Sequence, residues 1–398
     1  MDESGAADVH VKVDGALVPV ERDVFVALFH NSVMAGRAGV RDALAGKPLG
    51  FRKFVELARG AEIPYPLFFA PLEVVEEQVR MKTEKLTAGF TQSSFSMHSR
   101  SRVELRDIEL IVKDLRRKQD LLRRYDQTLV RNELVGLVKQ SRRPVAEDAA
   151  RIAKKLGLDL GAVRRPRKKE DALTALVNQL EAKQVLVSQS ARLHMPQLMP
   201  KGARFSGITI KDQKVPFIFL ASGDEGEGFE PAGRRVFTLM LLTVLIAQGT
   251  FAPVTYTGHT KDPKSPRAYE ITAELLMPAA DMRTMEFPDL DAVVEASNVF
   301  KVTPSAVTMR AWRLKLVDYD TFNALMDELS QARPGSSNGP RNQPLTVNAL
   351  KKYNGAECSH RMLGILDARH LNPTEFRRIV LLNKMPASGI DEFRAVVG

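Results

Sequence analysis

Histidine and cysteine are the side chains that most often bind zinc or act as the base and nucleophile of a hydrolase, and this sequence has few of them. The single cysteine, Cys358, lies two positions before His360. Residues two apart on a helix do not face each other, so we expect structural roles for this pair. One cysteine also excludes an intramolecular disulfide and a Cys-rich zinc site. No two histidines have the spacing that places two zinc ligands on one helix face; they are His10, His30, His98, His194, His259, His360 and His370.

Positive charge is the second chemical feature, and it is concentrated in one part of the chain. The formal net charge is +10. Between Arg100 and Lys169 there are 21 basic against 10 acidic residues, so this segment holds the whole surplus. A local surplus is typical of proteins that bind a phosphate backbone, although solvated helix faces have the same composition. The candidate nucleic-acid contacts are Arg116, Arg117, Lys118, Arg123, Arg124, Arg142, Arg143, Arg164, Arg165, Arg167, Lys168 and Lys169.

Hydrophobic periodicity predicts the elements that position these residues. A long amphipathic helix is predicted over 103–129, with an apolar stripe that suits either packing within the chain or a homodimer. Short runs of β-branched and aromatic residues predict strands at 184–188, 205–210 and 215–221. Further helices are predicted over 51–59, 147–156, 170–183, 235–248, 269–277, 289–300 and 304–316, with two short ones within 18–45.

Neither a membrane span nor a secretory signal is predicted. The longest apolar run, Val236–Ala247, has twelve residues. As a helix it spans about 18 Å, whereas a bilayer core needs about 30 Å. The first 23 residues carry six acidic side chains and lack an apolar stretch. We therefore expect a cytoplasmic protein that does not bind membranes.

A set of short motifs follows in a fixed order along residues 183–310 of the chain. They are Lys183-Gln-Val-Leu-Val187, Phe205-Ser-Gly-Ile-Thr-Ile210, Val215-Pro-Phe-Ile-Phe219, Arg235-Val-Phe-Thr-Leu239, Thr272-Ala-Glu-Leu-Leu-Met-Pro278 and Val302-Thr-Pro-Ser-Ala-Val307 with Arg310. In this order they resemble the ImmA/IrrE family of zinc metallopeptidases, in its longer form. The resemblance covers about residues 50–398 and implies a zincin-like core. It also implies an activity that cleaves repressor proteins and so switches mobile genetic elements or stress genes.

The chain departs from that family at the zinc site. Such a peptidase needs two His one helical turn apart, a Glu beside the first His as general base, and a carboxylate ligand downstream. At the positions that correspond to the two His, this chain has Leu241 and Leu245, and at the position of the Glu it has Leu242. Ser265 and Arg267 stand where the downstream carboxylate is expected. The sequence therefore predicts no metal, no cofactor and no catalysis. Relocated ligands would have to come from His259, Glu270 and Glu274.

The predicted helices 289–300 and 304–316 match a helix-turn-helix in outline. The second helix would then present Ser305, Thr308, Arg310, Arg313 and Lys315 to DNA. The alternative is that this pair is an ordinary packing element of the family.

These observations predict an α+β fold, mostly helical, with a small mixed β-sheet in a zincin-like core and flanking helical units. The main functional hypothesis is a non-catalytic DNA-binding transcription or immunity repressor of a prophage or mobile element. The alternative hypothesis is a pseudo-peptidase that captures a repressor-like partner by strand addition in the groove beside 215–220. A minor alternative is a zinc peptidase with relocated ligands. The predicted segments are an N-terminal helical region with a diverged or lost helix-turn-helix (1–80), a basic helical connector (81–145), the pseudo-peptidase core (146–288), the helix pair (289–330), a flexible linker (331–345) and a C-terminal helical unit (346–398).

Overall fold

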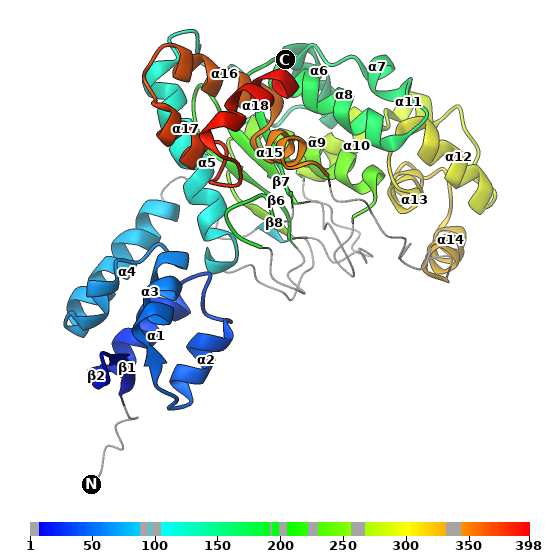
Figure 1. The fold of residues 1–398 in the computed structure, drawn as a ribbon. Helices are drawn as coiled ribbons and strands as arrows, with labels where there is room; N and C mark the ends of the chain where they lie inside the picture. The colour runs from blue at the N-terminus through cyan, green and yellow to red at the C-terminus, as the bar shows by residue number, and fades with distance from the viewer. Residues whose placement is uncertain are drawn as a thin grey trace. The chain divides into compact units, whose positions relative to one another are not determined.

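The computed structural model describes residues 8–87, 95–96, 105–191, 193–198, 205–221, 230–255, 267–331 and 344–398 of the 398-residue chain. They form two compact units, which are described separately (Figure 1). The first unit comprises 1–89, 103–114 and 196–200, and the second comprises the rest. The boundary falls within helix α5 (Leu105–Tyr125), so this helix belongs in part to each unit. The predicted linker lies almost entirely outside the described residues.

In the first unit a small mixed sheet is accompanied by helices. Its strand order is β2-β1-β3, with β1 (Val9–Val13) antiparallel to β2 (Ala16–Val20) and parallel to β3 (Leu49–Gly50). The core is aromatic, because Phe25, Phe29, Phe54 and Phe68 are all buried and their rings contact one another. The helices are α1 (Arg22–His30), α2 (Ala38–Leu44), α3 (Phe51–Gly60), the 3-10 helix η1 (Tyr65–Phe69) and α4 (Leu72–Thr87).

The β1–β2 hairpin corrects the prediction that residues 1–80 are helical. The two short helices expected within 18–45 are confirmed as α1 and α2, but two strands precede them. The hairpin turns at Asp14 and Gly15, whose φ angles are 49° and 91°. Two consecutive residues with positive φ form the turn type that joins tightly paired strands, and Asp-Gly is one of its preferred sequences.

The second unit is built on a five-stranded mixed sheet in the order β4-β8-β6-β7-β5. Strand β5 is parallel to β7, β6 is antiparallel to both β7 and β8, and β4 is parallel to β8. All three predicted strands are present, as β5, β6 and β7. The bounds are β4 (Phe95–Ser96), β5 (Leu186–Gln189), β6 (Phe205–Ile210), β7 (Phe217–Leu220) and β8 (Pro253–Thr255).

Helices cover both faces of this sheet, as Figure 1 shows. On one face the apolar helix α9 (Ala232–Gln248) packs on β6 and β7, and α8 (Lys169–Glu181) and α10 (Arg267–Leu276) pack against α9. Helix α6 (Val145–Leu156) packs in turn on α10. Short helices α7 (Leu160–Arg164) and α11 (Ala279–Met282) follow α6 and α10 along the chain.

On the opposite face the C-terminal helices close the sheet. Helix α15 (Thr346–Asn354) packs on β5, and the ring of Tyr353 contacts Phe219 of β7 at 6.5 Å between centroids. The remaining C-terminal elements are α16 (Ala356–Asp367), α17 (Pro373–Ile379), the 3-10 helix η3 (Ala387–Gly389) and α18 (Ile390–Val397).

The predicted helix pair is present as α12 (Leu290–Phe300) and α13 (Pro304–Arg313), and a third helix, α14 (Tyr319–Gln331), packs on both. The predicted α+β class, mostly helical with small mixed sheets, is thereby confirmed. Within the described ranges, no helix combines the length and apolarity needed to cross a bilayer.

Candidate nucleic-acid interface

The helix to which the resemblance assigns the zinc ligands is packed as hydrophobic core. The side chains of Leu241, Leu242 and Leu245 on α9 are 2%, 0% and 0% exposed. Leu242 lies directly over β6, since a Cβ built on Gly207 would be 2.7 Å from Leu242 Cδ1. Three buried leucines contribute roughly 1.5–3 kcal/mol each to the stability of the fold. Their side chains offer no lone pair to a metal, so α9 cannot provide the two ligands and the base at these positions.

Two charged residues of the neighbouring helix α10 are used in ion pairs. Arg267, which the resemblance places at a downstream ligand position, pairs with Asp148, and Glu274 pairs with Arg310. His259 and Ser265 lie outside the described residues. Among the residues that the structure describes, no group of three His, Cys, Asp or Glu is placed to hold a metal ion.

Helix α13 turns two of its predicted DNA contacts inward, which corrects that prediction. Thr308 is fully buried and its hydroxyl donates to the carbonyl of Pro304 at 3.1 Å. Arg310 is 8% exposed; its Nε donates to the carbonyl of Met277 at 3.2 Å, and its guanidinium pairs with Glu274. These two side chains fix α13 and cannot reach a DNA groove.

The other candidates on this element have different surroundings. Ser305 and Arg313 are half-buried, and Ser305 Oγ lies 3.1 Å from Thr303 Oγ1 at the start of the helix. Only Lys315, just past the end of α13, is exposed. A single exposed cation does not make a recognition helix, so the structure favours the packing alternative for α12 and α13.

Four of the twelve candidates in the basic segment also face inward, another correction. Lys118 is fully buried, with its ammonium 4.8 Å from the ring centroid of Tyr353. Arg116 is half-buried, and its burial lowers the pKa of the guanidinium. These two cations of α5 lie within the fold.

Arg164 and Lys169 join the basic segment to the helices that follow the core. Arg164 pairs with Asp281 at 2.8 Å and lies over the ring of Phe300. The Lys169 ammonium donates to Ser297 Oγ at 3.1 Å and to the Val302 carbonyl at 2.7 Å. Burial, reinforced by the nearby charge of Lys301, lowers the pKa of Lys169 to about 8. Both cations thus have structural roles.

The remaining eight candidates are exposed: Arg117, Arg123, Arg124, Arg142, Arg143, Arg165, Arg167 and Lys168. Part of their charge is neutralised locally. Arg123 pairs with Asp212 at 3.3 Å and with Asp120 at 3.7 Å, beside a hollow of about 330 Å³ that Lys214 also lines. Arg143 pairs with Glu147. Within the described part of the chain, Arg142 has no ion-pair partner.

The loop that carries Arg142 and Arg143 is held by the end of α9. The amide of Gly136 donates to the carbonyl of Ile246 at 3.1 Å, and the amide of Val138 donates to that of Ala247 at 2.8 Å. Both carbonyls lie in the last turn of α9, where they have no partner within the helix, and the Ile246 carbonyl also accepts from the amide of the C-cap residue Gly249 at 2.9 Å. Val138 is also buried in the core, so the backbone is fixed at the start of the segment that follows it.

A buried carboxylate fixes the other end of this loop. Asp148, in the first turn of α6, is fully buried and accepts from Ser141 Oγ at 2.8 Å and from Arg267 at 2.6 Å. The same Arg267 nitrogen donates to the carbonyl of Arg143. Arg151 of α6 donates to the Leu137 carbonyl at 3.1 Å and lies 3.5 Å from Asp148. The backbone from 137 to 143 is thus bound at both ends.

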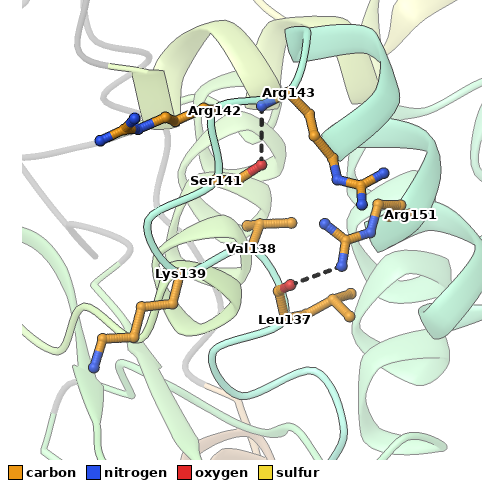
Figure 2. Close-up of a pocket in the computed structure, with 7 residues that line it drawn as sticks. All are labelled: Leu137, Val138, Lys139, Ser141, Arg142, Arg143 and Arg151. Atoms are coloured by element: carbon orange, nitrogen blue, oxygen red, sulfur yellow. Dashed lines mark hydrogen bonds between the residues drawn. The ribbon is translucent and has the colours of Figure 1, made fainter.

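This arrangement borders an open, shallow basic hollow of about 480 Å³. Figure 2 shows Lys139 and Arg142 extending to one side of the loop, with Arg143 and Arg151 on the other. Within the described chain, the carboxylates that pair with these cations are Glu147 and the buried Asp148. Lys139, like Arg142, has no ion pair among the described residues. The basic hollow is lined by Leu137, Val138, Lys139, Ser141, Arg142, Arg143 and Arg151.

Sequence reasoning found two of the four cations here and missed Lys139, Arg151 and the positioning group Asp148. A signal for Asp148 was present. It lies one turn before Ile152 on the face of α6 that is otherwise apolar. A carboxylate on an apolar face must be buried with partners, which points to cations nearby.

Comparisons of this chain with family models, with curated proteins and with solved structures return no match.

Proposed function

We propose that this chain is a non-catalytic relative of the ImmA/IrrE peptidases that binds double-stranded DNA, as a transcription or immunity repressor of a prophage or mobile element. The observation that carries the proposal is the basic hollow. Lys139 and Arg142 stand exposed on a backbone fixed by Asp148, whose own charge is neutralised from beneath by Arg267. Arginine and lysine placed in this way provide the contacts that DNA phosphates require.

The buried leucines of α9 support the non-catalytic part of the proposal. A zinc site needs imidazole and carboxylate ligands around an open coordination position. Leu241, Leu242 and Leu245 instead fill that space with apolar side chains. The residue at a former ligand slot, Arg267, now stabilises the loop of the basic hollow.

The strand-addition alternative has less support from the sheet. Strand β7, which was expected to line the open groove, lies between β6 and β5. The outer edge of β5 is also occupied, because the amide of Val187 faces Glu181 and the hydroxyl of Ser188 donates to the carbonyl of Tyr353. The edge strand at the other side, β4, has two residues.

The test is a titration of duplex DNA at several salt concentrations. The intergenic DNA beside the gene should be compared with a random duplex of equal length by mobility shift or fluorescence anisotropy. Each phosphate contact adds about −0.9 to the slope of log K against log salt, so a slope steeper than about −3 is expected. A selective preference for the intergenic duplex would support the repressor role. Affinity that does not change with salt would refute DNA binding.

A further inference from the structure

The basic hollow combines two properties that a diffuse basic surface lacks. Its backbone is bound at both ends, by α9 through Gly136 and Val138 and by Asp148 through Ser141. Its four cations lie on both sides of the loop: Figure 2 shows Lys139 and Arg142 extending to one side, and Arg143 and Arg151 to the other. A fixed backbone lowers the conformational entropy that the side chains it carries lose when they bind an anion.

The donor set matches phosphate. Arginine guanidinium groups present planar pairs of N–H donors that fit two oxygens of a phosphate, and lysine adds a mobile charge. Arg143 and Arg151 each use part of their donors within the fold, on Glu147 and on the carbonyl of Leu137.

We propose that the basic hollow is a preorganised binding site for phosphate groups, with Asp148 and Arg267 as its positioning residues. The inference rests on the proposed function for one point only, the source of the phosphate. Phosphodiesters of a DNA strand and the phosphates of a free polyphosphate have the same chemistry at this site. Arg267 connects the two parts of the site because one of its nitrogens bonds both to Asp148 and to the Arg143 carbonyl.

The main experiment uses the full chain, the double variant Lys139→Ala/Arg142→Ala, and Arg378→Ala as a control. Lys139 and Arg142 make no ion pair in the described fold, so the double variant should fold normally. Arg378 is an exposed cation of α17, remote in sequence from the basic segment. Two probes are compared, a random duplex and inorganic pyrophosphate.

The expected result is specific to the hollow. For the duplex, the double variant should have a salt slope shallower by about two, whereas Arg378→Ala should leave the slope unchanged. For pyrophosphate, followed by calorimetry or by the shift of Tm, the double variant should bind about tenfold more weakly for each cation that no longer bonds to the anion.

The outcomes separate this inference from the proposed function. If the double variant binds the duplex as the natural protein does, the phosphate site at the basic hollow is refuted, while DNA binding by the chain stands. If pyrophosphate binding depends on Lys139 and Arg142 and the chain binds no duplex, the phosphate site stands and the proposed DNA binding is refuted. Binding of neither probe would overturn both.

A second variant tests the positioning role of Asp148. Replacing Asp148 by Asn removes a negative charge beside the site, so electrostatics alone predicts tighter phosphate binding. If Asp148 instead positions the loop, Asp148→Asn should bind pyrophosphate several-fold more weakly. Tighter binding would overturn the positioning role. Ser141→Ala breaks the same link without a change of charge and should also weaken binding, which keeps the test decisive if Asp148→Asn fails to fold.

Discussion

The helix pair α12–α13 and the loop of the basic hollow are both candidate DNA contacts in the sequence, and the fold uses their cations in opposite ways. In α13, Arg310 is buried against a carboxylate, Glu274. Beside the loop, the buried group is a carboxylate, Asp148 of α6, and Arg142 on the loop stays exposed. The difference shows that a cation remains available for binding at the surface only where the fold gives it no buried partner.

The same helix supplies the ion-pair partner of the buried group in both regions. Helix α10 contributes Glu274 to Arg310 and Arg267 to Asp148, two turns apart on the same ten-residue element. Its carboxylate turns a candidate DNA-binding arginine into a structural one. Its guanidinium neutralises Asp148 and so leaves the four cations that line the basic hollow with little competing negative charge.

The largest expected effect comes from Arg310→Ala. This change leaves Glu274, 16% exposed, and the carbonyl of Met277 without their partner. Removing one member of a buried ion pair costs roughly 3–5 kcal/mol in the free energy of unfolding. Urea denaturation should show this loss, whereas Arg142→Ala should change stability by less than about 0.5 kcal/mol. Equal effects of the two variants would remove the distinction between the two regions.

A second prediction concerns a buried carboxylate, Glu181, that forms no ion pair with the described residues. Glu181, 4% exposed, accepts from the amides of Val187 and Glu357, at 3.4 and 3.2 Å, and so joins α8 to β5 and the start of α16. Burial raises the pKa of Glu181 to about 7, opposed by these hydrogen bonds and reinforced by the charge of Glu357. The native state therefore holds a proton that the unfolded chain releases above a pH of about 4.5.

Stability from Glu181 is consequently complete below a pH of about 4.5 and is lost as the pH rises toward 7. The loss amounts to about 3 kcal/mol at most. Urea midpoints measured between pH 4.5 and 8 should fall more steeply for the natural protein than for Glu181→Gln, which stays neutral. Parallel profiles for the two proteins would contradict this origin of the pH dependence.

The sequence predicted the framework of the second unit well, because its signals are local. The apolar run 236–247 and the β-branched strands 205–210 and 215–221 require burial wherever they occur, and they became α9, β6 and β7. The hairpin at Asp14-Gly15 was missed although its signal is also local, since alternating valines flank that dipeptide.

The site was less predictable because it depends on contacts far apart in the chain. Nothing near Arg142 in the sequence indicates that Arg267, more than a hundred positions later, neutralises Asp148. For the same reason the sequence could not separate Arg310 from Arg142. Only tertiary packing gives Arg310 a carboxylate as its partner.

A smaller effect is expected for Arg267→Ala. Asp148 loses its shortest hydrogen bond but keeps Ser141 and, at 3.5 Å, Arg151. Since Arg267 is about one third exposed, water screens part of its charge, and we expect a loss of roughly 1–2 kcal/mol by urea denaturation. If Arg267→Ala lowered the free energy of unfolding as much as Arg310→Ala, the two ion pairs would contribute equally to the stability of the fold.

The smallest structural perturbation gives the sharpest test of the comparison. Arg142→Ala and Lys315→Ala each remove one exposed cation, from the loop and from the end of the helix pair respectively. Both should unfold like the natural protein. In the duplex titration, only Arg142→Ala should reduce the salt slope, by about one, because our proposal assigns phosphate contacts to the loop and none to α13. If Lys315→Ala reduced it as well, α13 would reach the DNA despite its buried Thr308 and Arg310, and the two regions would form one binding surface.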